Sequence, residues 1–147
     1  MALRYLAQRP RSEQEVRQRL RRAGVAEDAA DGVLAQLRQR GLVDDEAFAQ
    51  YWLEQRQTFR PRGARLLRAE LRQHGIAADL VTAAADELAG SADEDAYRAA
   101  QKRARYLATA DERAFKARLS QFLLRRGFGW EAISPAVERL YVEVNTS

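Results

Sequence analysis

The feature that most constrains the fold is a segment that recurs along the chain. Residues 10–37, PRSEQEVRQRLRRAGVAEDAADGVLAQL, align without a gap with residues 61–88, PRGARLLRAELRQHGIAADLVTAAADEL. A third copy, residues 113–140, aligns at a further offset of about 52 residues. The first two copies share Pro10/Pro61, Arg17/Arg68, Leu20/Leu71, Arg21/Arg72, Gly24/Gly75 and Leu37/Leu88, and the third keeps Leu123, Gly127 and Leu140 in register. A period of about 51 residues predicts three similar structural units.

Each copy has the pattern of two helices joined by a tight glycine turn. Apolar residues four positions apart, such as Val16 and Leu20 in the first copy, lie on one face of a helix. The glycine that follows, Gly24 and its equivalents, stands where that helix should end, and an apolar residue comes next. Because glycine adopts positive φ without steric cost, this pattern predicts a Schellman cap in every unit.

The residues between the copies complete each unit with one more helix. Residues 44–59 and 91–108 carry apolar residues at helical spacing behind acidic starts, and residues 2–8 would form a short first helix. Capping boxes, in which Ser or Thr is followed three residues later by Glu, are expected at three helix starts. The pairs are Ser12/Glu15, Ser91/Glu94 and Thr109/Glu112.

The predicted fold is all-α, with three tandem three-helix repeats in an elongated, curved array. The expected units are residues 1–43, 44–90 and 91–147. Each unit alone has a small core, so neighbouring units are expected to pack through their apolar faces. Pro135 leaves two alternatives for the last helix, because proline fits a first turn but disrupts a helix interior. Either Ser134 caps a late start, or the helix is bent.

The composition excludes most kinds of catalytic site. The chain has no cysteine and one histidine, His74, so disulfides, thiolate metal sites and histidine-based triads have nothing to build from. No phosphate-binding loop, nucleophile–base pair or carboxylate pair stands out. We therefore expect a protein that is not an enzyme and has no cofactor. Because His74 precedes its capping glycine, its expected role is a contact with the negative end of the helix dipole.

The sequence shows no sign of a membrane span or a secretory signal. It has no apolar run of about 18 residues and no apolar block behind a basic start. We expect a monomeric, cytoplasmic protein without a membrane partner.

An arginine cluster in the second copy is the strongest candidate for a binding surface. Residues 56–72 contain six arginines against one carboxylate, a local charge that exceeds the net charge of +4 of the whole chain. At helical spacing Arg65, Arg68 and Arg72 form a stripe opposite the apolar face. Guanidinium groups suit phosphates or a carboxylate-rich protein surface. A solvated helix face is the simpler alternative. The expected partner-binding residues here are Arg60, Arg62, Arg65, Arg68 and Arg72.

The other units supply secondary candidates. Arg21 belongs to the RQRLRR segment of the first copy, where Glu13 and Glu15 lie close upstream and can pair with the arginines at helical spacing. In the third unit the candidates are Arg98, Lys102 and Arg105, which form another stripe.

The two tryptophans could stack on bases. Aromatic residues at helical spacing are more typical of a core, however. We therefore expect both Trp52 and Trp130 to be packing residues.

These segments together resemble a bacterial family, RecX. The resemblance is carried by ALRYLAQRPRSEQEVRQRLRRAGV at residues 2–25, LRQRGLVDDEAFAQYW at residues 37–52 and RPRGARLLRAELRQHGI at residues 60–76. It covers nearly the whole chain, and the order and spacing of the segments are specific together. The third copy departs from the pattern, with RAFKA where the others have RPR, so the basic signature is not carried onto it.

The resemblance implies a function as well as a fold. It implies three tandem three-helix repeats and a regulator of the RecA recombinase. Such a protein would bind the RecA filament on single-stranded DNA, in its helical groove, and inhibit recombinase activity without a cofactor. The expected partners are therefore the RecA filament and the single-stranded DNA within or near it.

A direct DNA-binding protein, for example a transcriptional repressor, is the main alternative. Two helices around a glycine turn superficially resemble a helix-turn-helix. Three tandem units without a dimerisation segment do not suggest a palindromic operator, which weighs against this alternative. A helical adaptor with a different partner is a third possibility.

Overall fold

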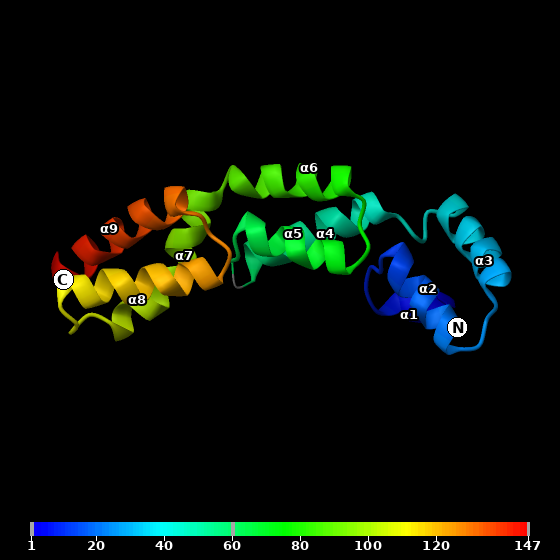
Figure 1. The fold of residues 1–147 in the computed structure, drawn as a ribbon, viewed down its shortest axis with the longest axis horizontal. Coiled ribbons are helices and arrows are strands. Elements are labelled where there is room, and N and C mark those ends of the chain that lie inside the picture. Colours follow the sequence, from blue (N-terminus) through cyan, green and yellow to red (C-terminus); the bar gives the residue numbers. More distant parts are fainter. Residues whose placement is uncertain (1, 60, 147) are drawn as a thin grey trace.

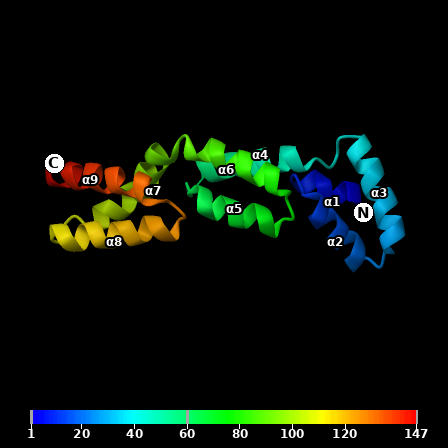
Figure 2. The same cartoon turned by 45° about the horizontal axis from the view of Figure 1, so that its top comes forward.

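The protein is an elongated array of helices with its two ends at opposite extremes (Figures 1 and 2). The structure, a computed structural model, describes residues 2–59 and 61–146. Within these residues every regular element is an α-helix. The helices are α1 (Ala2–Gln8), α2 (Glu13–Arg22), α3 (Glu27–Gln39), α4 (Asp45–Thr58), α5 (Ala64–Gln73), α6 (Ala78–Ala89), α7 (Ala92–Tyr106), α8 (Glu112–Arg125) and α9 (Trp130–Thr146).

The helices form three successive units along the long axis, each with a core of its own. The first unit is α1–α3, the second α4–α6 and the third α7–α9, and together they make a slightly curved rod (Figure 1). Their buried apolar residues form three separate clusters. The all-α repeat fold is confirmed, but the buried cores do not merge as expected. No helix within the described residues is long and apolar enough to cross a bilayer.

The predicted glycine turns are present in all three units. Gly24, Gly75 and Gly127 have φ of 84°, 75° and 93°. In each unit the amide of the next residue donates to a carbonyl in the last turn of the preceding helix, as from Ile76 to Leu71 at 3.1 Å. This is the Schellman pattern, and it satisfies carbonyls that the helix end would otherwise leave unpaired.

Helix starts were predicted less well than helix ends. The capping box of Ser12 and Glu15 is confirmed, with both reciprocal hydrogen bonds formed. The boxes at Ser91 and Thr109 are wrong. The Ser91 hydroxyl instead donates to the carboxylate of Asp95 at 2.7 Å, and Asp111 caps α8.

Pro135 lies inside α9, which starts at Trp130. The alternative in which Ser134 caps a late start is therefore wrong. The proline falls in the second turn of the helix, and its ring nitrogen has no hydrogen to donate to the turn before it.

The second and third units meet where the start of α5 lies against the glycine turn after α8. The amide of Gly63 donates to the carbonyl of Arg126 at 2.8 Å. Nη2 of Arg65 donates to the carbonyl of Leu124 at 2.7 Å. A Cβ at Gly63 would lie 2.2 Å from the carbonyl oxygen of Gly127, so the two backbones are in direct contact.

The first and second units meet at the equivalent place. Gln14, which holds the repeat position of Arg65, donates from Nε2 to the carbonyl of Gln73 at 3.1 Å in the last residue of α5. A Cβ at Gly75 would meet the Gln14 side chain, again at a glycine turn. The first and second units therefore each set the start of their second helix against the glycine turn of the next unit.

A half-buried carboxylate adds a polar cluster to the first junction. Oε2 of Glu15 lies 2.7 Å from Nη2 of Arg9, and Oε1 of Glu15 lies 3.2 Å from Nδ1 of His74. The His74 ring packs against both Phe48 and Trp52, with ring centroids 5.2 and 4.6 Å away. Burial raises the pKa of Glu15, but the Ser12 amide and Arg9 outweigh it, so the net pKa is lowered. His74 thus serves a contact between units.

We predict that Gly63→Ala weakens the second junction. The added methyl would overlap backbone atoms, which cannot move aside as a flexible side chain can. The expected loss is about 1–3 kcal/mol in the free energy of unfolding, measured by urea denaturation. Gly32→Ala in α3 is the control, because nothing lies within 4 Å of its Cβ position. Equal stability of the two variants would contradict the close contact.

We predict that Glu15→Gln destabilises the protein in a pH-dependent way. The folded-state pKa of Glu15 lies below its ordinary value of 4.5, so its contribution is complete above that pH and is lost as the pH falls through the folded pKa. The expected loss at pH 7 is about 2 kcal/mol. Urea denaturation at pH 7 and at acid pH should show wild type and variant converging below about pH 4.5. If the difference in unfolding free energy between wild type and variant stayed constant with pH, ionisation of Glu15 would not contribute to the stability of the junction.

Candidate partner-binding surface

The structure places the three arginines of the α5 stripe in different environments. Arg65 is exposed, but its Nη2 is bound to the carbonyl of Leu124. Arg68 is half-buried, with Nη2 3.9 Å from Oδ1 of Asp86. Arg72 is exposed and has no hydrogen bond or ion pair with any described residue. The stripe is therefore free of partners only at its C-terminal end.

The first unit explains why Arg72 has no partner. Arg21 occupies the equivalent repeat position, and its Nη2 lies 2.8 Å from Oε1 of Glu27. The hydrogen bond from Arg21 lowers the pKa of Glu27. The second unit has Ala78 at the position equivalent to Glu27. The arginine is thus kept in both units, while its carboxylate partner is present only in the first.

A second missing carboxylate affects Arg68 in the same way. In the first unit Nη1 of the equivalent residue, Arg17, lies 2.7 Å from Oδ1 of Asp31. Thr82 stands at the position of Asp31 in the second unit. Arg68 is left with its long contact to Asp86. The second unit therefore leaves these two arginines without the close carboxylate partners that their equivalents have in the first unit.

The other arginines of the second-unit cluster are half-buried or lie outside the described residues. Arg62 is half-buried ahead of α5, and its buried Nε has no hydrogen-bond partner among the described residues. Arg56 forms an ion pair with Glu70, the one carboxylate in this stretch. Arg60 lies outside the described residues.

In the third unit the predicted stripe on α7 is divided. Nη2 of Arg98 donates to the carbonyl of Gln57 at 2.7 Å and to Oδ1 of Asp95 at 2.8 Å, so it ties α7 to α4. Lys102 and Arg105 are exposed and have no partner among the described residues. These two side chains and Arg72 are the exposed site candidates that have no partner among the described residues.

Arg21 is neutralised, but not by the carboxylates expected from helical spacing. Glu13 pairs with Arg38 of α3, which lowers the pKa of Glu13, and Glu15 pairs with Arg9. Local spacing could not show that α3 folds back against the start of α2.

The two tryptophans have opposite environments. Trp52 packs against the second core as expected. Trp130 does not, because 63% of its surface is exposed. It shares a helical face with Ile133, which is why periodicity predicted burial, but it is the first residue of α9 and lies at the edge of the third core.

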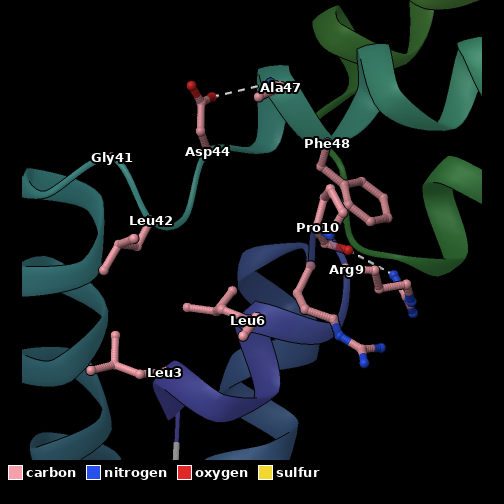
Figure 3. Close-up of a pocket in the computed structure, with 11 residues that line it drawn as sticks. Leu3, Leu6, Arg9, Pro10, Gly41, Leu42, Asp44, Ala47 and Phe48 are labelled. Atoms are coloured by element: carbon pink, nitrogen blue, oxygen red, sulfur yellow. Dashed lines mark hydrogen bonds between the residues drawn. The ribbon is translucent and has the colours of Figure 1, made fainter.

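An apolar groove in the first unit was not predicted (Figure 3). It has a volume of about 490 Å³ and is lined by Leu3 and Leu6 of α1 and by Leu42 of the α3–α4 connection. In the other two units the first helix packs along the third. The shorter α1 makes no comparable contact with α3, and Leu3 and Leu42 stay partly exposed.

Nothing in the described residues provides a metal centre. No group of three or more His, Asp or Glu side chains among them could hold an ion. The arrangement offers cations without partners, which can bind phosphate or carboxylate groups.

Comparison with known proteins finds one family throughout. The models described as the first, second and third three-helix domains of RecX match residues 1–37, 44–84 and 92–137. Regulatory protein RecX of Geobacillus thermodenitrificans is 37% identical over 90% of the chain. The chain spans 50% of that relative's length. Regulatory protein RecX of Chlorobium limicola is 34% identical over 95% of the chain and 87% of its own length.

A solved structure has the same fold. The crystal structure of RecX from Lactobacillus salivarius superposes with a TM-score of 0.82, covering 96% of this chain and 92% of that one, at 23% identity. Its agreement extends the match from sequence to the arrangement of the three units. The chain therefore belongs to the RecX family of regulatory proteins.

Proposed function

We propose that this protein binds the RecA filament on single-stranded DNA and inhibits its recombinase activities, namely ATP hydrolysis, strand exchange and coprotease function. Membership of the RecX family supports a regulatory role. The resemblance described above supplies RecA as the partner. In this proposal the protein has no catalytic role.

The observation that carries the proposal is that two arginines of the second unit lack the close carboxylate partners that their equivalents have in the first unit. The first unit neutralises Arg17 and Arg21 with carboxylates of its third helix. The second unit keeps both arginines as Arg68 and Arg72 but has no carboxylate at the equivalent positions. Unpaired guanidinium groups suit an anionic partner, whether phosphate or protein carboxylate.

The shape of the array also fits a filament. Repeat proteins present long surfaces because each unit contacts only its neighbours. Exposed cations without a partner among the described residues occur in both the second unit, at Arg72, and the third unit, at Lys102 and Arg105. An extended partner with regularly spaced subunits can contact several of these groups at once. Because the groups belong to one molecule, the first contact raises the effective concentration for the next and so increases the overall affinity.

A helix-turn-helix repressor is supported less well. The glycine turns of the second and third units lie against the preceding unit, with Gln14 near Gly75 and Leu66 near Gly127. A helix that enters a DNA groove needs open surroundings at its first turn.

We predict that the protein inhibits ATP hydrolysis by RecA on single-stranded DNA. Inhibition is expected at amounts below one protein per RecA subunit, because one array should span neighbouring subunits. The measurement is the steady-state hydrolysis rate with increasing amounts of this protein. Unchanged hydrolysis under conditions of filament assembly would refute the proposed function.

We predict that restoring the missing carboxylates weakens this inhibition. Ala78→Glu with Thr82→Asp should neutralise Arg68 and Arg72, as Glu27 and Asp31 neutralise their equivalents. Both changed residues are exposed at the start of α6, where acidic side chains are favourable, so stability should not fall. The concentration for half-maximal ATPase inhibition should rise about tenfold, equal to about 1.4 kcal/mol.

The control variant carries the same added charge elsewhere. Ala35→Glu with Ala83→Glu changes two exposed helical positions that are not equivalent to Glu27 or Asp31. It should inhibit like wild type. If both double variants lost inhibition equally, general charge would be responsible, and Arg68 and Arg72 would have no specific role.

A further inference from the structure

An exposed tryptophan borders a groove on the third unit. Trp130 is 63% exposed at the first residue of α9. Trp130 and the outer face of α8 line an open groove of about 430 Å³. The α8 side chains in this groove are small or partly apolar, among them Ala117, Ser120 and Leu124. The indole is thus beside a shallow space that a flat ring can enter.

Three exposed arginines of α8 lie near the groove, although none of them lines it. Arg113 precedes Ala117 by four residues, so it lies on the same face of α8. Arg118 and Arg125 lie three residues before and four residues after Gln121, which lines one edge. All three arginines are exposed and have no hydrogen bond or ion pair with a described residue.

The other charged groups near the groove do not cancel this charge. Lys116 is held by Glu112 at 2.8 Å and by Glu138 at 2.9 Å, and these contacts raise its pKa. Glu112 and Glu138 are therefore already paired with Lys116. Glu131, next to Trp130, is the exposed carboxylate that remains. At the Leu124 end, the exposed guanidinium of Arg65 donates to the Leu124 carbonyl and adds another cation.

We propose that this groove binds single-stranded nucleic acid, with a base stacked on Trp130 and phosphates held by Arg113, Arg118 and Arg125. Proteins that bind single strands combine aromatic stacking surfaces with positively charged surroundings. The inference rests on the proposed function for its biological partner, because single-stranded DNA is part of the filament proposed above. It adds a site on the third unit that is separate from Arg68 and Arg72.

The arrangement favours a nucleic acid strand over a protein surface. A strand places phosphates on both sides of a stacked base, and the exposed arginines occur at intervals along α8, the helix that forms one wall of the groove. A protein side chain that filled the groove would need a carboxylate near each arginine.

The test measures binding of a fluorescein-labelled oligothymidylate by anisotropy in the absence of RecA. Trp130→Ala should weaken binding about tenfold, the order expected for one lost stacked base, and Trp130→Phe should restore most of it. Tyr106→Ala is the matched control, because Tyr106 is an exposed aromatic residue outside the groove, and its affinity should equal that of wild type. Arg118→Gln with Arg125→Gln should reduce the log–log salt slope by roughly 0.7 per arginine.

A second readout locates the base. The chain has two tryptophans, so Trp52→Phe leaves Trp130 as the only indole, and its fluorescence should be quenched by the oligonucleotide. Unchanged affinity of Trp130→Ala would overturn the proposal. If Trp130→Ala kept its affinity for the oligonucleotide but lost ATPase inhibition, the groove would be a protein-binding site. If the wild-type protein bound the oligonucleotide through Trp130 but did not inhibit the RecA ATPase, this site would stand and the proposed function would be refuted. The two failures can therefore be told apart.

Discussion

The whole array depends on the glycine turn that ends the second helix of each unit. Positive φ at this position lets the chain reverse directly into the third helix, and the next amide closes the helix end. The same turn in the second and third units receives the preceding unit. At Gly127 the approach is so close that Gly63 has no room for a side chain. One backbone conformation therefore fixes both the fold of a unit and its contact with its neighbour.

Much of the fold could be predicted because its determinants are local. Apolar spacing and glycine position set the helices and their ends, and both depend on neighbours within a few residues. Predictions failed where distant groups compete for a side chain. Ser91 was expected to cap α7, but it also lies beside α4 and accepts a hydrogen bond from Gln57. Separate cores were likewise missed, because a repeat pattern does not show whether its apolar faces point within a unit or between units.

The candidate site was less predictable, because an arginine's role depends on what lies across from it. The stripe on α5 gave the right helix face but could not show that Arg65 reaches a carbonyl of the third unit. Arg98 is held in a similar way by the end of α4. Trp130 was misassigned because helical spacing gives direction around a helix but not the distance from the core. Each correction comes from a contact between residues far apart in sequence.

Comparison of repeat positions within the chain separates structural charge from charge available for binding. Exposed ion pairs contribute about 0–1 kcal/mol, so a unit can lose the carboxylate opposite Arg72 and still fold. Gln14 and Arg65 each donate to a backbone carbonyl near the end of the second helix of the next unit, although one is neutral and the other positive. The two junctions therefore share a hydrogen-bond donor at this repeat position, whereas the charge differs. The second unit keeps Arg68 and Arg72 without the close carboxylates that pair with their equivalents in the first unit, and an anionic partner would account for these two arginines.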